Sequence, residues 1–223
     1  MNTANKTTRI LGVAFLFQFV TSFTGGVSLK PAWFVEGDIG ATMLKIAQNP
    51  LLMRATILLD MLTALGVAFL GVVLYLTLRK QGEKAALTAL VFYILEGAVL
   101  AASKLETFSI LRFSQEYVVA GQPAELLRLA QIAAESMDFV GGTLHMLAFC
   151  AGAIPFYFLL YRSGVVPRWL SLWGLITVFP LLVGTLTQIF GYNIPFGFYV
   201  PYVPFELVIG LWLVIKGLPE STS

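Results

Sequence analysis

Residues 56–78 read TILLDMLTALGVAFLGVVLYLTL, a run of 23 positions with a single ionisable side chain, Asp60. A helix of that length rises about 34 Å at roughly 1.5 Å per residue, enough to cross a hydrocarbon core about 30 Å thick. Lipid offers the backbone no hydrogen bonds, so such a run is stable there only as a helix. This stretch therefore predicts a membrane-spanning helix.

The composition of the whole chain points the same way. The chain has 223 residues, of which 58% are hydrophobic and 12% charged, and its net charge is +2. Its mean hydropathy is +0.84. Soluble domains carry about 25% charged residues, so the soluble globular class is excluded. The small net charge and the lack of a basic block argue against a nucleic-acid partner. The single cysteine, Cys150, excludes an internal disulfide.

Six apolar runs predict one all-α integral membrane domain over residues 1–223, a bundle of six transmembrane helices. The approximate spans are 10–29, 56–78, 85–102, 138–161, 169–190 and 205–215. The first run follows Lys6 and Arg9 but lacks the small-residue cleavage site of a signal peptide, so we expect it to be retained.

The lysines and arginines near the helix ends predict the orientation. With the N-terminus inside, the inner segments carry eight cations and two acids, whereas the outer segments carry six of each. This excess of +6 on one side predicts that both termini are cytoplasmic.

Short amphipathic helices are expected in the outer segments. Asp38 is suited to cap a helix over residues 39–48, and Asn49 is suited to cap a span that begins with Pro50. The stretch 191–204 holds three prolines and no charge, so we expect an irregular, aromatic-rich loop or lid at the headgroup level.

Ionisable side chains at membrane depth are candidate functional groups, because each is costly there unless it is paired or hydrated. Of these, Glu96, His145 and Asp60 are the candidate catalytic residues. Counting from the helix ends places Glu96 and His145 near the midplane, Asp60 in the outer half, and Asp138 and Glu206 near the outer rim. We expect Glu96 and His145 to face each other and to exchange protons with a substrate, while Asp60 tunes the pKa values of both residues.

Polar residues recur on nearly every expected helix, which predicts a polar pocket open toward the outer face. Asp138 and His145 are expected to share one face of their helix with Gly142 between them. The candidate substrate-binding residues are Gln18, Tyr93, Asp138, Gln188 and Glu206.

Each of these residues also has a purely structural interpretation as a hydrogen-bonding partner that fixes helix packing. For Asp138 and Glu206 this interpretation is favoured, with Arg54, Lys104 or Arg112 as the expected partner. One histidine and one cysteine are too few for a metal centre built on nitrogen and sulfur ligands, so no metal or cofactor is predicted. The G-x-S-x-G and H-E-x-x-H motifs are absent.

Several motifs occur together along the chain: GDIGAT at 37–42, NPLL at 49–52, LEGAVL at 95–100, GQPAE at 121–125, YRSGVVPRWL at 161–170 and ELVIGLWL at 206–213. With Leu144-His145 and Lys216-Gly217, they resemble the bacterial membrane family named domain of unknown function 4386. Members often have an aspartate close before this histidine, whereas Asp138 stands seven residues upstream. The resemblance covers nearly the whole chain and implies a six-helix protein of the bacterial inner membrane, with no established activity.

Two functions remain open. The first is the handling of a small or lipid-like molecule in the outer-facing pocket, as an enzyme or as a carrier. The alternative is a structural or regulatory membrane partner whose polar residues serve only helix packing. The expected partners are membrane lipids and a small hydrophobic ligand, and the sequence specifies neither the substrate nor the oligomeric state.

Overall fold

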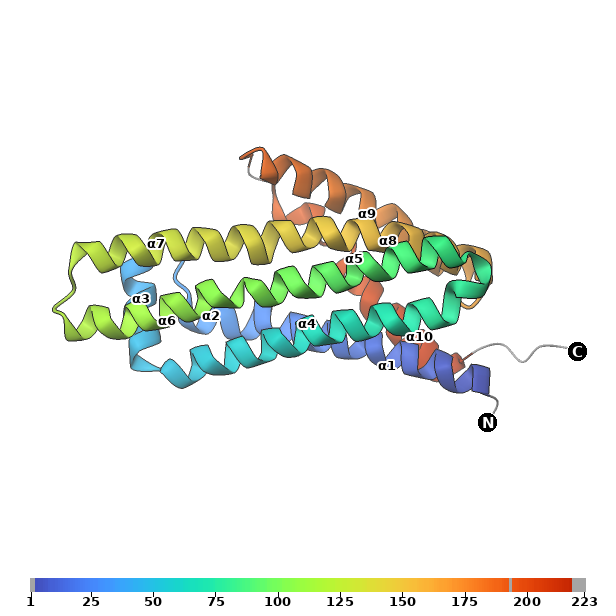
Figure 1. Ribbon diagram of the computed structural model, residues 1–223, viewed down its shortest axis with the longest axis horizontal. Coiled ribbons are helices and arrows are strands. Elements are labelled where there is room, and N and C mark those ends of the chain that lie inside the picture. The colour runs from blue at the N-terminus through green and yellow to red at the C-terminus, as the bar shows by residue number, and fades with distance from the viewer. Residues whose placement is uncertain (1–2, 193, 218–223) are drawn as a thin grey trace, which may run out of the picture. The chain divides into compact units, whose positions relative to one another are not determined.

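The computed structural model describes residues 3–192 and 194–217, and these residues form helices joined by short turns, with no β-strand among them. The α-helices are α1 (Thr3–Phe23), α2 (Lys30–Trp33), α3 (Ile39–Gln48), α4 (Pro50–Leu78), α5 (Glu83–Ala102), α6 (Lys104–Val119), α7 (Ala124–Asp138), α8 (His145–Ser163), α9 (Arg168–Ile189) and α10 (Val203–Lys216) (Figure 1). The same residues include the π-helices η1 (Thr24–Leu29) and η3 (Phe139–Leu144) and the 3₁₀-helices η2 (Arg79–Gln81) and η4 (Phe196–Phe198).

Five helical stretches within the described residues are long and apolar enough to cross a membrane. They are Lys6–Trp33, Pro50–Gln81, Glu83–Val119, Ala124–Ser163 and Arg168–Ile189. The all-helical class and five of the six expected spans are thus supported. The remaining expected span falls in α10, whose 14 residues are fewer than the roughly 20 that a full crossing needs.

The short outer helix begins and ends where the sequence predicts. Asp38 accepts a hydrogen bond from the Ala41 backbone N–H at 2.8 Å and so caps α3, whose Met43 is fully buried. Asn49 Oδ1 accepts from the Leu52 N–H at 3.2 Å, and Pro50 is the first residue of α4. The two predicted helix starts are therefore confirmed.

The chain divides into two compact units, and several helices contribute to both. Unit 1 comprises residues 1–19, 65–97 and 143–223, and unit 2 comprises residues 20–64 and 98–142. Each unit has a buried apolar core of its own.

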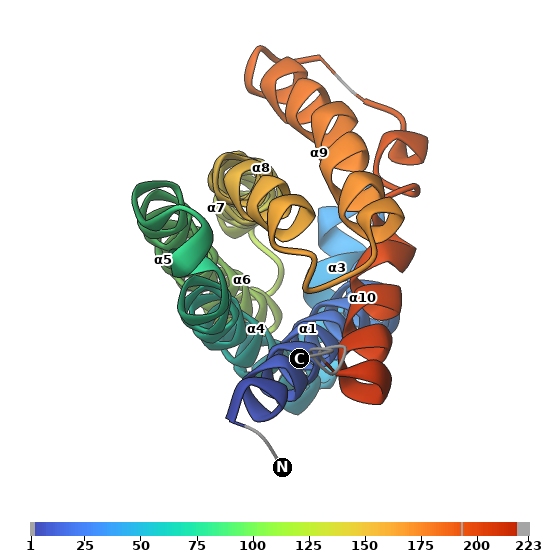
Figure 2. The same cartoon turned by 90° about the vertical axis from the view of Figure 1, so that its right-hand side faces the viewer.

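Unit 1 is closely packed because glycines let its helices approach. Tyr93 of α5 packs against Gly71 of α4 and Gly152 of α8. A Cβ added at Gly71 would lie 2.7 Å from the Tyr93 Cβ, and one added at Gly152 would lie 2.6 Å from the Tyr93 ring. A Cβ added at Gly12 of α1 would lie 2.8 Å from the Gly210 carbonyl oxygen of α10, so these two helices also approach closely. Figure 2 shows α9 beside α8, with α10 beside α1.

Unit 2 is built on the antiparallel α6–α7 hairpin, against which α3 packs (Figure 1). Its main core contains Trp33, Ile46, Met53, Ile110, Leu111, Ala133 and Met137. Gly121 and Gln122 turn the chain between α6 and α7 with φ angles of 78° and 64°, a region that glycine adopts readily.

Two π-helices interrupt stretches that the sequence pattern treated as regular. The segment η1 lies inside the first expected span, and η3 separates Asp138 from His145. A π-helical turn closes over more residues than an α-helical turn, so the α-helical spacing is lost across it. The expectation that Asp138, Gly142 and His145 share one face rested on an unbroken α-helix and is corrected by η3.

Among the described residues of the expected loop, 191–192 and 194–202 contain no α-helix, as expected, but they do not stay at the end of α9. Trp173 Nε1 donates to the Pro201 carbonyl at 2.9 Å, and Trp173 lies in the second turn of α9. A Cβ at Gly174 would lie 2.5 Å from the Phe205 ring. The chain therefore returns along α9, and Glu206 lies near the start of that helix, whereas the sequence argument placed it at the level of the helix end.

Candidate functional site

The candidate residues divide between the two units. Unit 2 holds Asp60 and Asp138, and unit 1 holds Gln18, Tyr93, Glu96, His145, Gln188 and Glu206. The structure thus places the candidate residues in two separate groups, each of which has its own geometry.

The two acids of unit 2 are both ion-paired. Asp60 Oδ2 accepts a hydrogen bond from Lys104 Nζ at 2.7 Å, and the two side chains are only 22% and 11% exposed. Asp138 Oδ1 pairs with Lys30 Nζ at 2.9 Å in a more open position. Lys30 is not among the partners expected for Asp138. Of those expected cations, Lys104 is already engaged by Asp60.

Glycines of the two π-helices press against polar side chains of unit 2. A Cβ at Gly25 of η1 would lie 2.9 Å from Asp60 Oδ1, and a Cβ at Gly141 of η3 would lie 2.6 Å from Ser103 Oγ. Ser103 directly precedes Lys104, so η1 contacts a member of the Asp60–Lys104 pair and η3 contacts the neighbour of the other member. These contacts make that pair part of the packing of unit 2.

Glu96 of α5 differs from both paired acids. Its side chain is buried, with 5% exposed, and Oε2 has no hydrogen-bond partner among the described residues. The Tyr93 hydroxyl, one turn earlier on the same helix, is likewise unpartnered within the described part of the chain. A buried polar group without a partner is costly, so its retention calls for an explanation beyond packing.

A chain of hydrogen bonds joins two tyrosines to the second carboxyl of unit 1. Tyr202 donates to Glu206 Oε1 at 3.0 Å, and its oxygen lies 2.6 Å from that of Tyr157 of α8. Since the Tyr202 proton is used toward Glu206, Tyr157 is the donor in the second bond. Both carboxyl groups, Glu96 of α5 and Glu206 of α10, belong to unit 1.

Three further candidates lie elsewhere in unit 1. Gln188 of α9 accepts a hydrogen bond from the Tyr199 hydroxyl at 2.9 Å, which ties the returning segment to α9. Gln18 is buried near α4, where a Cβ at Gly66 would lie 3.3 Å from its Oε1. His145 is the first residue of α8 and is half-buried. The pairing of His145 with Glu96 stays a prediction.

Sequence reasoning missed the roles of Tyr157, Tyr202 and Trp173. All three were counted only as apolar or interfacial aromatics, although a tyrosine or tryptophan inside a core usually needs a partner for its polar atom. Tyr157 lies among the apolar residues of α8, and that unusual position is the one signal the sequence offers.

The arrangement in unit 1 is suited to proton exchange and to hydrogen bonding of a polar group. It combines two carboxyls with three buried tyrosines, whose neighbours include the rings of Phe149, Phe156 and Phe205. Among the described residues, no three His, Cys, Asp or Glu side chains are arranged to hold a metal ion.

Five helical stretches that are long and apolar enough to cross a membrane define the chain as a polytopic membrane protein of the all-helical class. Within that class it belongs to the family described as domain of unknown function DUF4386, which it matches over residues 10–217. The resemblance seen in the sequence motifs is therefore confirmed. A comparison with curated proteins gave no match, and a comparison with solved structures gave none either.

Proposed function

We propose that this protein handles a small or lipid-like molecule within the membrane and that Glu96 is the group that exchanges a proton during this process. The observation that carries the proposal is the burial of Glu96 with one carboxylate oxygen unpartnered among the described residues. An ionisable residue kept at membrane depth without a structural partner is typical of substrate and proton pathways.

The contrast with the other acids supports this assignment. Asp60, Asp138 and Glu206 each hold a partner that accounts for them as packing elements. The pair with Lys104 gives Asp60 a structural role, so the proposal no longer uses it to tune Glu96. Glu96 is the acid that this structural interpretation leaves unexplained.

The enzyme and the carrier versions of the proposal share the same groups. In the enzyme version, Glu96 passes a proton to or from the bound molecule with His145 as its partner. In the carrier version, the binding and release of that proton accompany movement of the molecule across the membrane. Tyr93, one turn from Glu96, supplies an unpartnered hydroxyl that is suited to binding a polar head group.

For the topology we propose six spans in a bacterial inner membrane, with both termini in the cytoplasm. The eight lysines and arginines of unit 1 lie in α1 before Ile10, around the α4–α5 and α8–α9 turns, and at the end of α10. This distribution agrees with the excess of cations on cytoplasmic segments. In this arrangement α10, together with the returning residues 194–202, forms the sixth crossing. Within that segment, the Pro201 carbonyl is satisfied by the Trp173 indole N–H of α9.

Two helical stretches are longer than a crossing requires. The 37 residues of Glu83–Val119 and the 40 of Ala124–Ser163 rise about 55 Å and 60 Å, against about 40–45 Å for a whole bilayer. Residues 104–138 carry eight charged side chains. We therefore assign the α6–α7 hairpin to the aqueous phase on the outer side.

The proposal is tested by the molecules that purify with the protein. We expect mass spectrometry of the extracted small molecules to show one lipid-like compound enriched with the wild-type chain and lost from Glu96→Gln. Asp138→Asn, which changes an exposed ion pair of unit 2, is the matched control and is expected to retain it. Equal content in the wild type and in Glu96→Gln would contradict the proposal.

A further inference from the structure

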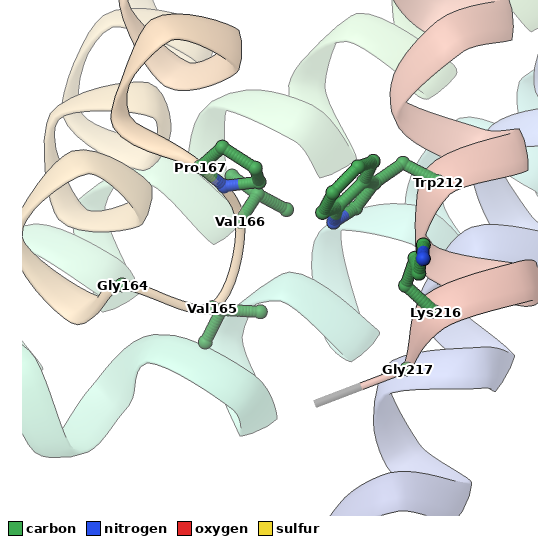
Figure 3. A pocket seen from close by; sticks show the side chains of 7 residues that line it. All are labelled: Gly164, Val165, Val166, Pro167, Trp212, Lys216 and Gly217. Atoms are coloured by element: carbon green, nitrogen blue, oxygen red, sulfur yellow. The ribbon is translucent and has the colours of Figure 1, made fainter. Parts of the chain in front are cut away.

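A cavity lies at the end of unit 1 where the α8–α9 turn meets the last turn of α10. Its volume is about 310 Å³, within the range of about 300–1,000 Å³ that is typical of ligand sites. The lining residues are Gly164, Val165, Val166, Pro167, Trp212, Lys216 and Gly217. Figure 3 shows Trp212 and Lys216 on one side of this cavity and the turn residues on the other.

The two large side chains of the cavity have different characters. Trp212 and Lys216 are four residues apart on α10 and therefore share one helix face. The indole is half-buried and gives an apolar wall together with Val166 and Pro167. The ammonium group of Lys216 belongs to an exposed residue, and within the described part of the chain it forms no ion pair or side-chain hydrogen bond.

The side chains that line the cavity include one cation, Lys216. None of the seven lining residues is acidic. Three helix ends border the cavity: the N-terminus of α9 after Pro167, where the dipole is positive, and the C-termini of α8 and α10 at Gly164 and Gly217, where it is negative. The nearby cations Arg162 and Arg168 lie over the rings of Phe158 and Tyr161, so Lys216 is the cation directed at the cavity.

We propose that this cavity binds the phosphate group of an anionic phospholipid, with Lys216 as the cationic ligand and Trp212 against the lipid beneath the headgroup. The site lies at the end of helices that cross the membrane, where tryptophan and lysine are typical of the headgroup level. Basic pockets between transmembrane helices bind lipid headgroups by this chemistry. The inference does not depend on Glu96, which is not among the lining residues.

The test is native mass spectrometry of the delipidated full chain titrated with phosphatidylglycerol or with phosphatidylcholine. We expect the wild type to retain phosphatidylglycerol preferentially and Lys216→Ala to lower that retention about fivefold. Lys80→Ala is the matched control, since it removes an exposed cation of η2 that does not line the cavity. Lys216→Arg keeps the positive charge and is expected to keep the preference for phosphatidylglycerol. This variant distinguishes loss of the charge from an effect of substitution on folding.

Each arm has a decisive outcome. Equal retention of the two lipids by the wild type, or equal losses in Lys216→Ala and Lys80→Ala, would overturn the proposal. Inorganic phosphate at millimolar concentration is added as a competitor. If phosphate does not displace phosphatidylglycerol, a lipid is supported as the occupant. If phosphate displaces both lipids equally and the wild type prefers neither lipid, the proposal is contradicted and a soluble phosphate is indicated as the occupant. Glu96→Gln is expected to retain phosphatidylglycerol like the wild type, so this result is independent of the proposed function.

Discussion

Asp60 and Lys104 are 44 positions apart in the chain, yet their side chains meet at 2.7 Å and are largely shielded from water. The glycine backbone of η1 closes over the aspartate from the other side. This ion pair therefore joins α4, α6 and η1 within unit 2, and it explains why an aspartate is kept in an apolar helix.

We predict that Asp60→Asn lowers the free energy of unfolding by about 1–3 kcal/mol. Breaking a fully buried pair costs about 3–5 kcal/mol, and the partial exposure of these side chains reduces that figure. The measurement is thermal unfolding of the purified protein in detergent. The control is Asp138→Asn, which breaks the more exposed pair with Lys30 and is expected to cost at most about 1 kcal/mol. Equal losses in the two variants would show that the Asp60–Lys104 pair is not shielded as described.

A second prediction concerns η1. Gly25→Ala is expected to be destabilising by about 1–3 kcal/mol, because its Cβ would lie 2.9 Å from Asp60 Oδ1 while Lys104 holds the same carboxylate through Oδ2. The adjacent Gly26→Ala is the control, since a Cβ there has open space around it and alanine favours a helix. Thermal unfolding of both variants tests the contact, and similar midpoints would rule it out.

The caps and the spans could be predicted from the sequence because they depend on neighbouring residues. The side chains of Asp38 and Asn49 cap helix starts by local hydrogen bonds, so these starts can be predicted. Long apolar runs likewise predict helices that can cross a membrane. The π-helices could not be predicted, because Gly-Gly in a helical run is compatible with several backbone forms. The error over Asp138, Gly142 and His145 follows from that gap.

The return of the chain along α9 also could not be predicted from the sequence pattern. The prolines show that 191–204 is irregular, but its direction is set by tertiary contacts such as the bond between Trp173 and Pro201. The position of Glu206, and with it the Tyr157–Tyr202–Glu206 chain of hydrogen bonds, depends on those contacts. Burial of Glu96, by contrast, was predictable from its place in the middle of an apolar run.

A third prediction tests the topology. A cysteine at Gln122, in the α6–α7 turn, is expected to react with a membrane-impermeant maleimide on intact cells, whereas a cysteine at Lys80, in the α4–α5 turn, is expected to react only after permeabilisation. The native Cys150 is fully buried and serves as the internal blank. Labelling of Lys80→Cys on intact cells would contradict the proposed orientation and indicate the opposite one.

The central claim is that Glu96 is retained for function and not for packing, and the stability of Glu96→Gln tests it most directly. We predict a thermal unfolding midpoint equal to or above that of the wild type, since Oε2 of this buried carboxyl has no hydrogen bond among the described residues that an amide of the same shape would lose. His145→Gln, measured in parallel, shows whether the expected partner behaves in the same way. A fall in the Glu96→Gln midpoint as large as that of Asp60→Asn would contradict the account and identify Glu96 as a packing residue.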